Sequence, residues 1–193
     1  MSIKNNPLLP EYRQELEKVW KNDTDMVEYC IKQTQSLVKL STGQLFATDK
    51  PSIETRFCFG YSDIGQGPSY DECNDEMDDF RKHEAEYFKH ENLQCFDNFI
   101  EQLDGDGVKQ LYVTNRYRDD YGANIVTTTW ISDFDFECHG LRREMYTKVS
   151  AQDKEAIKAV YLADRADMEK RLDTYLKKYG TKKLHVWRYW IDE

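Results

Sequence analysis

The sequence has no long apolar run, and no segment approaches the roughly 20 residues that a membrane-spanning helix needs. The amino-terminal stretch, MSIKNNPLLPEYRQ, lacks the apolar centre of a secretory signal. No Gly/Ser-rich or Pro-rich linker divides the 193 residues, and no internal repeat is present. We therefore expect a cytoplasmic protein without membrane contact, folded as a single domain over residues 1–193.

Catalytic signatures are also missing. The five cysteines are widely spaced, so they predict neither a disulfide framework nor a paired-cysteine zinc site. There is no GxSxG nucleophile elbow, and the four scattered histidines do not indicate a general base. We therefore expect a protein that is not an enzyme and that has no catalytic residues.

What the sequence does contain is a rich set of aromatic residues, 13 Tyr, 9 Phe and 4 Trp, which can supply large buried areas. Apolar residues at helical spacing predict a helix that starts near Pro10 and a second from about Asn22, whose apolar stripe extends to Val38. Residues 44–47 and 53–61 have the strand period and predict a small meander.

The carboxyl-terminal half predicts a hairpin of residues 110–117 and 123–132, and further strands over 143–149 and 184–191. Between those last two strands, Ser150 and Asp153 form the pattern of a capping box before a long helix. Gly180 has the place of a C-cap glycine. We expect Leu172 to lie on the apolar face of this helix, in the core of the protein. The fold class is then α+β, with a mostly antiparallel sheet flanked by amphipathic helices. The carboxylates expected on the exposed side of the long helix are Glu155, Asp164 and Glu169.

Negative charge is concentrated in one part of the chain. Residues 62–106 contain fourteen Asp and Glu against three Lys and Arg, a net charge of −11, whereas the whole chain carries −9. A solvated helix face is the ordinary explanation of such a run. The alternative is that helical carboxylates over about residues 69–104 imitate backbone phosphates and dock on a basic groove. The candidate partner-binding residues are Asp71, Glu72, Asp75, Glu76, Asp78, Asp79 and Glu86.

A second group of carboxylates lies in the segment DFDFECHG. If this segment is a strand, Asp133, Asp135 and Glu137 share one face, and that spacing suits a divalent metal in a phosphoryl-transfer or nuclease site. The alternative function is therefore a metal-dependent nucleic-acid-processing enzyme that uses these three residues. An exposed edge strand explains the same alternation without any chemistry.

Zinc is a further possibility that the spacing permits. His90 and Cys95 are close in sequence, near an expected break between two helices, and Cys138-His139 could approach from the sheet. These four residues are the candidate ligands of one structural zinc ion. The other reading is that the cysteines fill gaps in the core as small apolar side chains.

The run IETRFCFGYSD, followed by YDEC and then EYFKHENL, resembles small accessory proteins of Gram-positive phages, plasmids and conjugative elements. The resemblance covers roughly residues 53–93. It implies a counter-defence protein, similar to the acidic inhibitors of type II CRISPR effectors, some of which bind zinc. The implied partner is a protein with a basic nucleic-acid-binding surface, such as a CRISPR effector nuclease in the host cell, and we expect no direct binding to nucleic acid.

Overall fold

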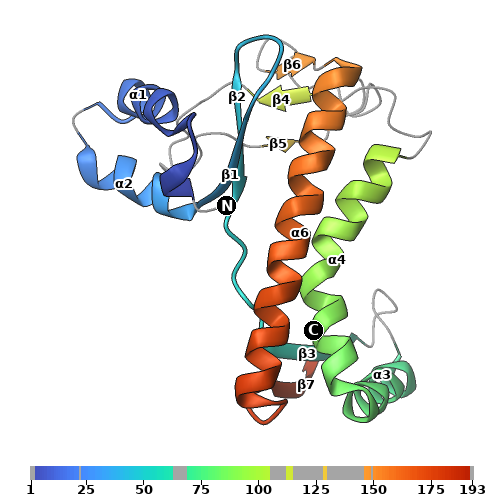
Figure 1. Cartoon of the computed structure of the whole chain (residues 1–193). Coiled ribbons are helices and arrows are strands. Elements are labelled where there is room, and N and C mark those ends of the chain that lie inside the picture. The colour runs from blue at the N-terminus through green and yellow to red at the C-terminus, as the bar shows by residue number, and fades with distance from the viewer. Residues whose placement is uncertain are drawn as a thin grey trace. The chain divides into compact units, whose positions relative to one another are not determined.

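The structure is a computed structural model that describes residues 3–21, 23–62, 69–104, 112–114, 128–129, 146–148 and 150–191. The chain divides into two compact units, and each is built from two segments that are distant in sequence (Figure 1). The first unit comprises Met1–Pro51 and Asn98–Asp164, and the second comprises Ser52–Asp97 and Arg165–Glu193. Of the three boundaries between them, one lies after Pro51 and the other two fall within long helices, α4 (Glu84–Asp104) and α6 (Ala151–Tyr179).

The first unit begins with a short 3-10 helix, η1 (Ile3–Asn5), and two amphipathic helices, α1 (Leu9–Val19) and α2 (Thr24–Gln33). Pro10 lies in the first turn of α1, where its missing N–H costs no hydrogen bond. The side chain of Asp23 caps α2 by accepting a hydrogen bond from the amide of Met26 at 3.0 Å. The apolar faces of α1 and α2 form one core with the strand residues that follow. Its buried members are Tyr12, Leu16, Trp20, Val27, Cys30, Ile31, Leu37, Leu45 and Ala47.

After α2 the chain forms a hairpin of β1 (Thr34–Lys39) and β2 (Leu45–Asp49), which pair antiparallel. The prediction that the second helix extends to Val38 is therefore wrong, because residues 34–39 form a strand. The hydroxyl of Thr34 donates to the carbonyl of Cys30 at 2.8 Å and lies 3.2 Å from the hydroxyl of Tyr12, contacts that hold the chain as it leaves α2. A second core cluster in this unit joins β2 to the adjoining ends of α4 and α6. It consists of Leu40, Phe46, Leu103 and Ile157.

The predicted hairpin and the strand after it are partly described. β4 (Tyr112–Thr114) pairs antiparallel with β5 (Thr128–Thr129) and with β6 (Tyr146–Lys148). The order of this small sheet is β5-β4-β6. The antiparallel pairing of the two hairpin segments is confirmed for these residues.

The second unit contains β3 (Arg56–Ser62), α3 (Tyr70–Lys82), the first part of α4, the second part of α6 and β7 (His185–Ile191). β3 and β7 pair in parallel, with Phe57 opposite Val186 and Cys58 opposite Trp187. Parallel strands require a long crossover, and here the whole of the chain from α3 to α6 supplies it. Gly180, with a φ of 60°, ends α6 in the left-handed conformation, so the predicted C-cap glycine is confirmed.

The α+β class describes this mixture of helices and small sheets, but the expected single, mostly antiparallel sheet is not supported by the described strands. The described strands form three separate small sheets, one of them parallel, and helices dominate. The predicted meander of residues 44–47 with 53–61 is also wrong, because β2 pairs with β1 whereas β3 pairs with β7. Strands that are neighbours in sequence usually pair, but β2 and β3 do not. The boundary between the two units, after Pro51, lies between them.

Candidate acidic docking surface

The orientation of α3 is fixed by an aromatic cluster in the second unit. Cys73 and Phe80 on α3 have no exposed surface, and Phe57 and Phe59 on β3 are each 6% exposed. The ring of Phe80 lies 5.1 Å from that of Phe57 and 6.1 Å from that of Phe59, and Tyr87 contacts the same group. Aromatic pairs at these distances stabilise the packing beyond their buried area. The helix therefore presents one defined side to the core and the other to solvent.

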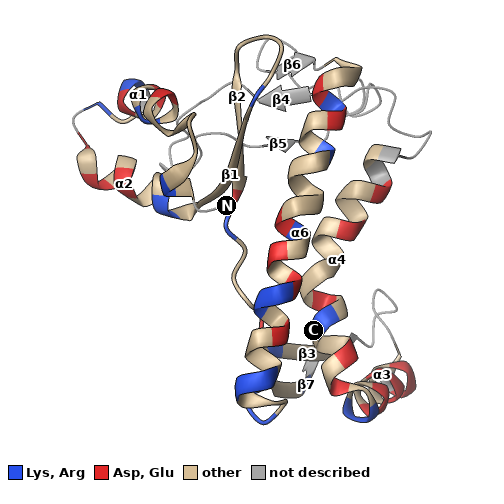
Figure 2. Cartoon of the chain, viewed as in Figure 1, with Lys and Arg blue, Asp and Glu red and all other residues tan. Residues whose placement is uncertain are grey.

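The predicted partner-binding carboxylates lie on the solvent side, and Figure 2 shows acidic residues along α3. On an α-helix, residues spaced by three and four lie in one row, so these side chains form two rows of three. One row contains Asp71, Asp75 and Asp78, and the other contains Glu72, Glu76 and Asp79. Glu86 follows on the first turn of α4. All seven candidate residues are exposed.

Glu72 has a structural role that the sequence interpretation did not assign to it. Its carboxylate accepts a hydrogen bond from the amide of Ser69 at 2.7 Å, and its own amide donates to the hydroxyl of Ser69 at 3.2 Å. This reciprocal pair is a capping box, which satisfies two backbone donors at the start of α3. The hydrogen bonds from Ser69, first from its backbone and then from its side chain, hold the pKa of Glu72 below the ordinary value. Substitution of Glu72 therefore perturbs the helix as well as the surface.

Two of the other carboxylates lie near cationic or basic groups. Asp78 lies 3.7 Å from the guanidinium of Arg81, and Glu86 lies 3.5 Å from the imidazole of His83, all on exposed side chains. Exposed pairs at this range contribute little energy, about 0–1 kcal/mol. Asp71, Asp75, Glu76 and Asp79 form no ion pair with any described residue. These four define the uncompensated part of the surface.

The density of charge on α3 is close to that of a nucleic acid. Asp71 and Asp79 are eight residues apart, which is about 12 Å along a helix axis. Six carboxylates fall within that length. Duplex DNA carries one negative charge per about 1.7 Å of its axis, or about seven over the same distance. The number of charges per length of α3 is thus similar to that of duplex DNA with both strands counted.

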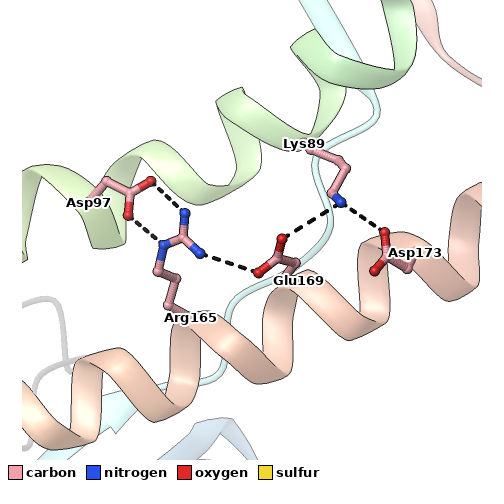
Figure 3. A network of polar contacts seen from close by, with 5 residues as sticks. All are labelled: Lys89, Asp97, Arg165, Glu169 and Asp173. Carbon is pink, nitrogen blue, oxygen red and sulfur yellow. Dashed lines mark hydrogen bonds and ion pairs between the residues drawn. The ribbon is translucent and has the colours of Figure 1, made fainter.

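A network of ion pairs connects α4 and α6 within the second unit (Figure 3). Arg165 binds both carboxylate oxygens of Asp97, and its Nη1 lies 3.3 Å from Glu169. Lys89 lies 2.9 Å from Asp173 and 3.7 Å from Glu169. The hydrogen bond to Asp97 is the main cause that raises the pKa of Arg165, and the one to Asp173 is the main cause that raises the pKa of Lys89.

This network was missed in the sequence, although the i,i+4 spacing of Arg165 and Glu169 was visible. In this network Asp97 is paired with Arg165, and Lys89, one of the three cations of the acidic segment, is paired with Asp173. The carboxylates of this segment are most closely spaced on α3, which has six of them within residues 71–79, while the longer helix α4 also carries six.

The zinc candidates are only partly described. His90 and Cys95 both lie on α4, which is unbroken from Glu84 to Asp104, while the break between helices is at His83. Five residues on one helix place two side chains about 140° apart around the axis, so this pair does not converge by itself. Cys138 and His139 lie outside the described residues. In the part of the chain that is described, no group of three His, Cys, Asp or Glu could hold a metal ion.

The carboxylates proposed for a metal-dependent enzyme, Asp133, Asp135 and Glu137, also lie outside the described residues. Comparison with known proteins gives no match to a family model, to a curated protein or to a solved structure. No helix within the described ranges is long and apolar enough to cross a bilayer.

Proposed function

We propose that this protein is a binding-type inhibitor that docks the acidic face of α3 on the basic nucleic-acid-binding surface of a defence protein. A type II CRISPR effector nuclease is the first candidate, because the segment of β3 and α3 resembles accessory proteins of phages and mobile elements. The docked helix would block the binding of nucleic acid. The observation that carries the proposal is the exposure of six candidate carboxylates on α3, a helix that the aromatic core holds in one orientation, with the seventh, Glu86, exposed on the first turn of α4.

The arrangement of charge is unfavourable for the helix itself. Asp75 has carboxylate neighbours three or four residues away on both sides, at Asp71, Glu72, Asp78 and Asp79. Like charges at these spacings destabilise a helix by about 0.2–0.5 kcal/mol per pair. An ordinary solvated face mixes both signs, whereas α3 has cations only in its last turn. A binding role for this face would account for the presence of such repulsion.

The test is a charge reversal that leaves the helix cap intact. Asp75→Lys, Glu76→Lys and Asp79→Lys are combined, and Glu72 is kept because it caps α3. A matched control reverses three exposed carboxylates of the first unit, Glu17→Lys, Glu101→Lys and Glu155→Lys, with the same change in net charge. The readouts are DNA cleavage by a purified type II effector with its guide RNA, and the affinity for that effector at two salt concentrations.

We expect the α3 reversal to abolish inhibition and the control to retain it. Neutral replacements, Asp75→Asn, Glu76→Gln and Asp79→Asn, should slow association, flatten the salt dependence and leave the fold as stable or more stable. If the two reversals weaken binding equally, only net charge matters and α3 is not the contact surface. Unchanged affinity of the α3 reversal for an effector that the wild type inhibits would rule the proposal out.

A further inference from the structure

The carboxyl-terminal part of α6 and the turn after it carry a second charged surface, opposite in sign to α3. Between Lys170 and Lys183 there are six cations and one carboxylate, Asp173, in a chain whose net charge is −9. Asp173 is bound to Lys89 on α4 and does not neutralise its neighbours. Basic residues at this end of α6 are visible in Figure 2. None of these six cations forms an ion pair with a described residue.

A cavity of about 380 Å³ opens at this surface. Its volume is within the usual range of small-molecule sites, about 300–1,000 Å³, but the cavity is shallow and largely open to solvent. One wall is Ile53, from the segment before β3, and the rest is a single face of α6. The residues of that face are Lys170, Arg171, Thr174, Tyr175, Lys178 and Tyr179.

Two tyrosine rings stand among the cations of this cavity. Tyr175 is held against the core by Phe88, with ring centroids 5.3 Å apart, and Tyr179 lies 5.0 Å from Tyr175. The ammonium groups of Lys178 and Lys183 lie 4.8 and 4.3 Å from the centre of the Tyr179 ring. Surfaces that combine aromatic rings with cations bind single-stranded nucleic acid, because bases stack on the rings while phosphates meet the cations.

Arg171 adds a guanidinium group to the wall of the cavity. Its Nη1 atom is buried, so a ligand in the cavity would meet the other N–H groups of the guanidinium. The forked geometry of a guanidinium group matches phosphate oxygens. The nearby carboxylates Glu169 and Asp173 are already engaged on the side of α6 that faces α4 (Figure 3).

We propose that this cavity binds a nucleotide unit, either a free nucleotide or one residue of a single strand. The base lies against the tyrosines, and the phosphate is bound by Arg171 with Lys170 and Lys178. An acidic peptide would satisfy the cations but would leave the ring-lined wall unused, so the nucleotide is the better match. This proposal differs from the sequence-based expectation that the protein does not bind nucleic acid, and it does not depend on the acidic surface of α3.

The test uses the full chain and fluorescence anisotropy with a labelled single-stranded dT12. An abasic strand with the same number of phosphates separates stacking from charge, and AMP, inorganic triphosphate and polyglutamate serve as competitors. The cavity variants are Lys170→Gln with Lys178→Gln, and Arg171→Met. The matched control is Lys18→Gln with Lys32→Gln, two exposed lysines of the first unit. Thermal melting of every variant verifies the fold.

We expect dT12 to bind at least tenfold more tightly than the abasic strand. The cavity variants should lose at least tenfold and the control less than twofold. With one phosphate engaged, log affinity should fall with log salt with a slope of about −0.7. Competition by AMP assigns the site to free nucleotides, and its absence assigns it to strands. No binding at physiological salt, equal losses in the two lysine pairs, or equal binding of abasic strand and polyglutamate would each overturn the proposal.

Discussion

Asp153 offers the sharpest test of how the first unit is held together. It is 3% exposed and accepts four hydrogen bonds, from the amide and hydroxyl of Ser41 at 2.8 and 2.5 Å and from the amide and hydroxyl of Ser150 at 3.3 and 2.9 Å. The amide of Asp153 in turn donates to the hydroxyl of Ser150, which completes the predicted capping box of α6. One carboxylate thus fixes the start of α6 and ties it to the turn after β1.

The perturbation is Asp153→Asn, which preserves volume and removes the charge. Hydrogen bonds to a charged group contribute about 1.5–3 kcal/mol and neutral ones about 0.5–1.5 kcal/mol. The asparagine side chain also has an NH2 donor in place of one carboxylate oxygen, and this donor faces the N–H and O–H groups of Ser41 and Ser150. We therefore expect a loss of about 2–3 kcal/mol in the free energy of unfolding at pH 7.

The same loss should depend on pH. Burial alone would raise the pKa of Asp153, but the hydrogen bonds from Ser41 and then Ser150 outweigh it and hold the pKa below the ordinary value. A carboxyl group with a lowered pKa contributes its full stabilisation above its unfolded pKa of about 3.9 and loses it as pH falls through the folded value. The difference between wild type and Asp153→Asn should therefore be constant from pH 7 to 5 and shrink below about pH 4.

Urea melts followed by circular dichroism at pH 7, 5, 4 and 3 measure this difference, with Glu155→Gln, an exposed residue of the same helix, as the control. The control should change stability by less than about 0.5 kcal/mol at every pH. A difference that stays the same at pH 3 and pH 7 would refute the hydrogen-bonded carboxylate, because protonation would then have no effect on the interaction. A loss under about 0.5 kcal/mol at pH 7 would show that the Ser41 contact carries no stability.

Three further outcomes are expected. Leu172→Ala, at a side chain with no exposed surface, should cost about 2–5 kcal/mol in a urea melt, and a change under about 0.5 kcal/mol would show that the second half of α6 is peripheral. In native protein a thiol reagent at pH 8 should modify exposed Cys58 and Cys95 before Cys30, because burial first and then Asp49 raise the pKa of Cys30 to about 11, and mass spectrometry after partial labelling gives the order. Elemental analysis of untagged protein should find about one zinc per chain if the predicted ligand set is formed, and less than a tenth of an equivalent with unchanged melting in chelator would leave the cysteines as packing residues.

Local signals in the sequence located several helix ends. Pro10, the Ser150–Asp153 capping box and Gly180 are at the helix ends where the sequence predicts them, since each acts on backbone groups a few residues away. The exposure of the α3 carboxylates was predictable for the same reason, because helical period alone separates them from Cys73 and Phe80. The role of Glu72 in the helix cap could have been predicted, because Ser69 three residues earlier completes the pattern of a capping box.

Long-range pairing was not predictable from such signals. Nothing in residues 53–61 indicates that β3 pairs in parallel with the last strand of the chain and not with its neighbour. Asp164 was expected to be exposed and is 4% exposed instead, because the hydroxyls of Ser36 and Thr48, more than 110 residues away, donate to it at 2.6 and 2.5 Å. Glu169 is likewise drawn into the network with Lys89. Only the tertiary fold brings these partners together.

The two charged surfaces of the second unit have different physical consequences. Repulsion among the α3 carboxylates lowers the stability of the helix, so their neutralisation should raise its stability and reduce partner binding together. The cations of α6 are spread along a helix and a turn around tyrosines. A ligand that fills this cavity should stabilise the fold by an amount that grows with the logarithm of its concentration over Kd, about 2.7 kcal/mol at a hundredfold excess over Kd. The rise in stability when α3 carboxylates are neutralised and the rise when a nucleotide binds at α6 can therefore be measured separately. The first tests the acidic surface, and the second tests the cavity.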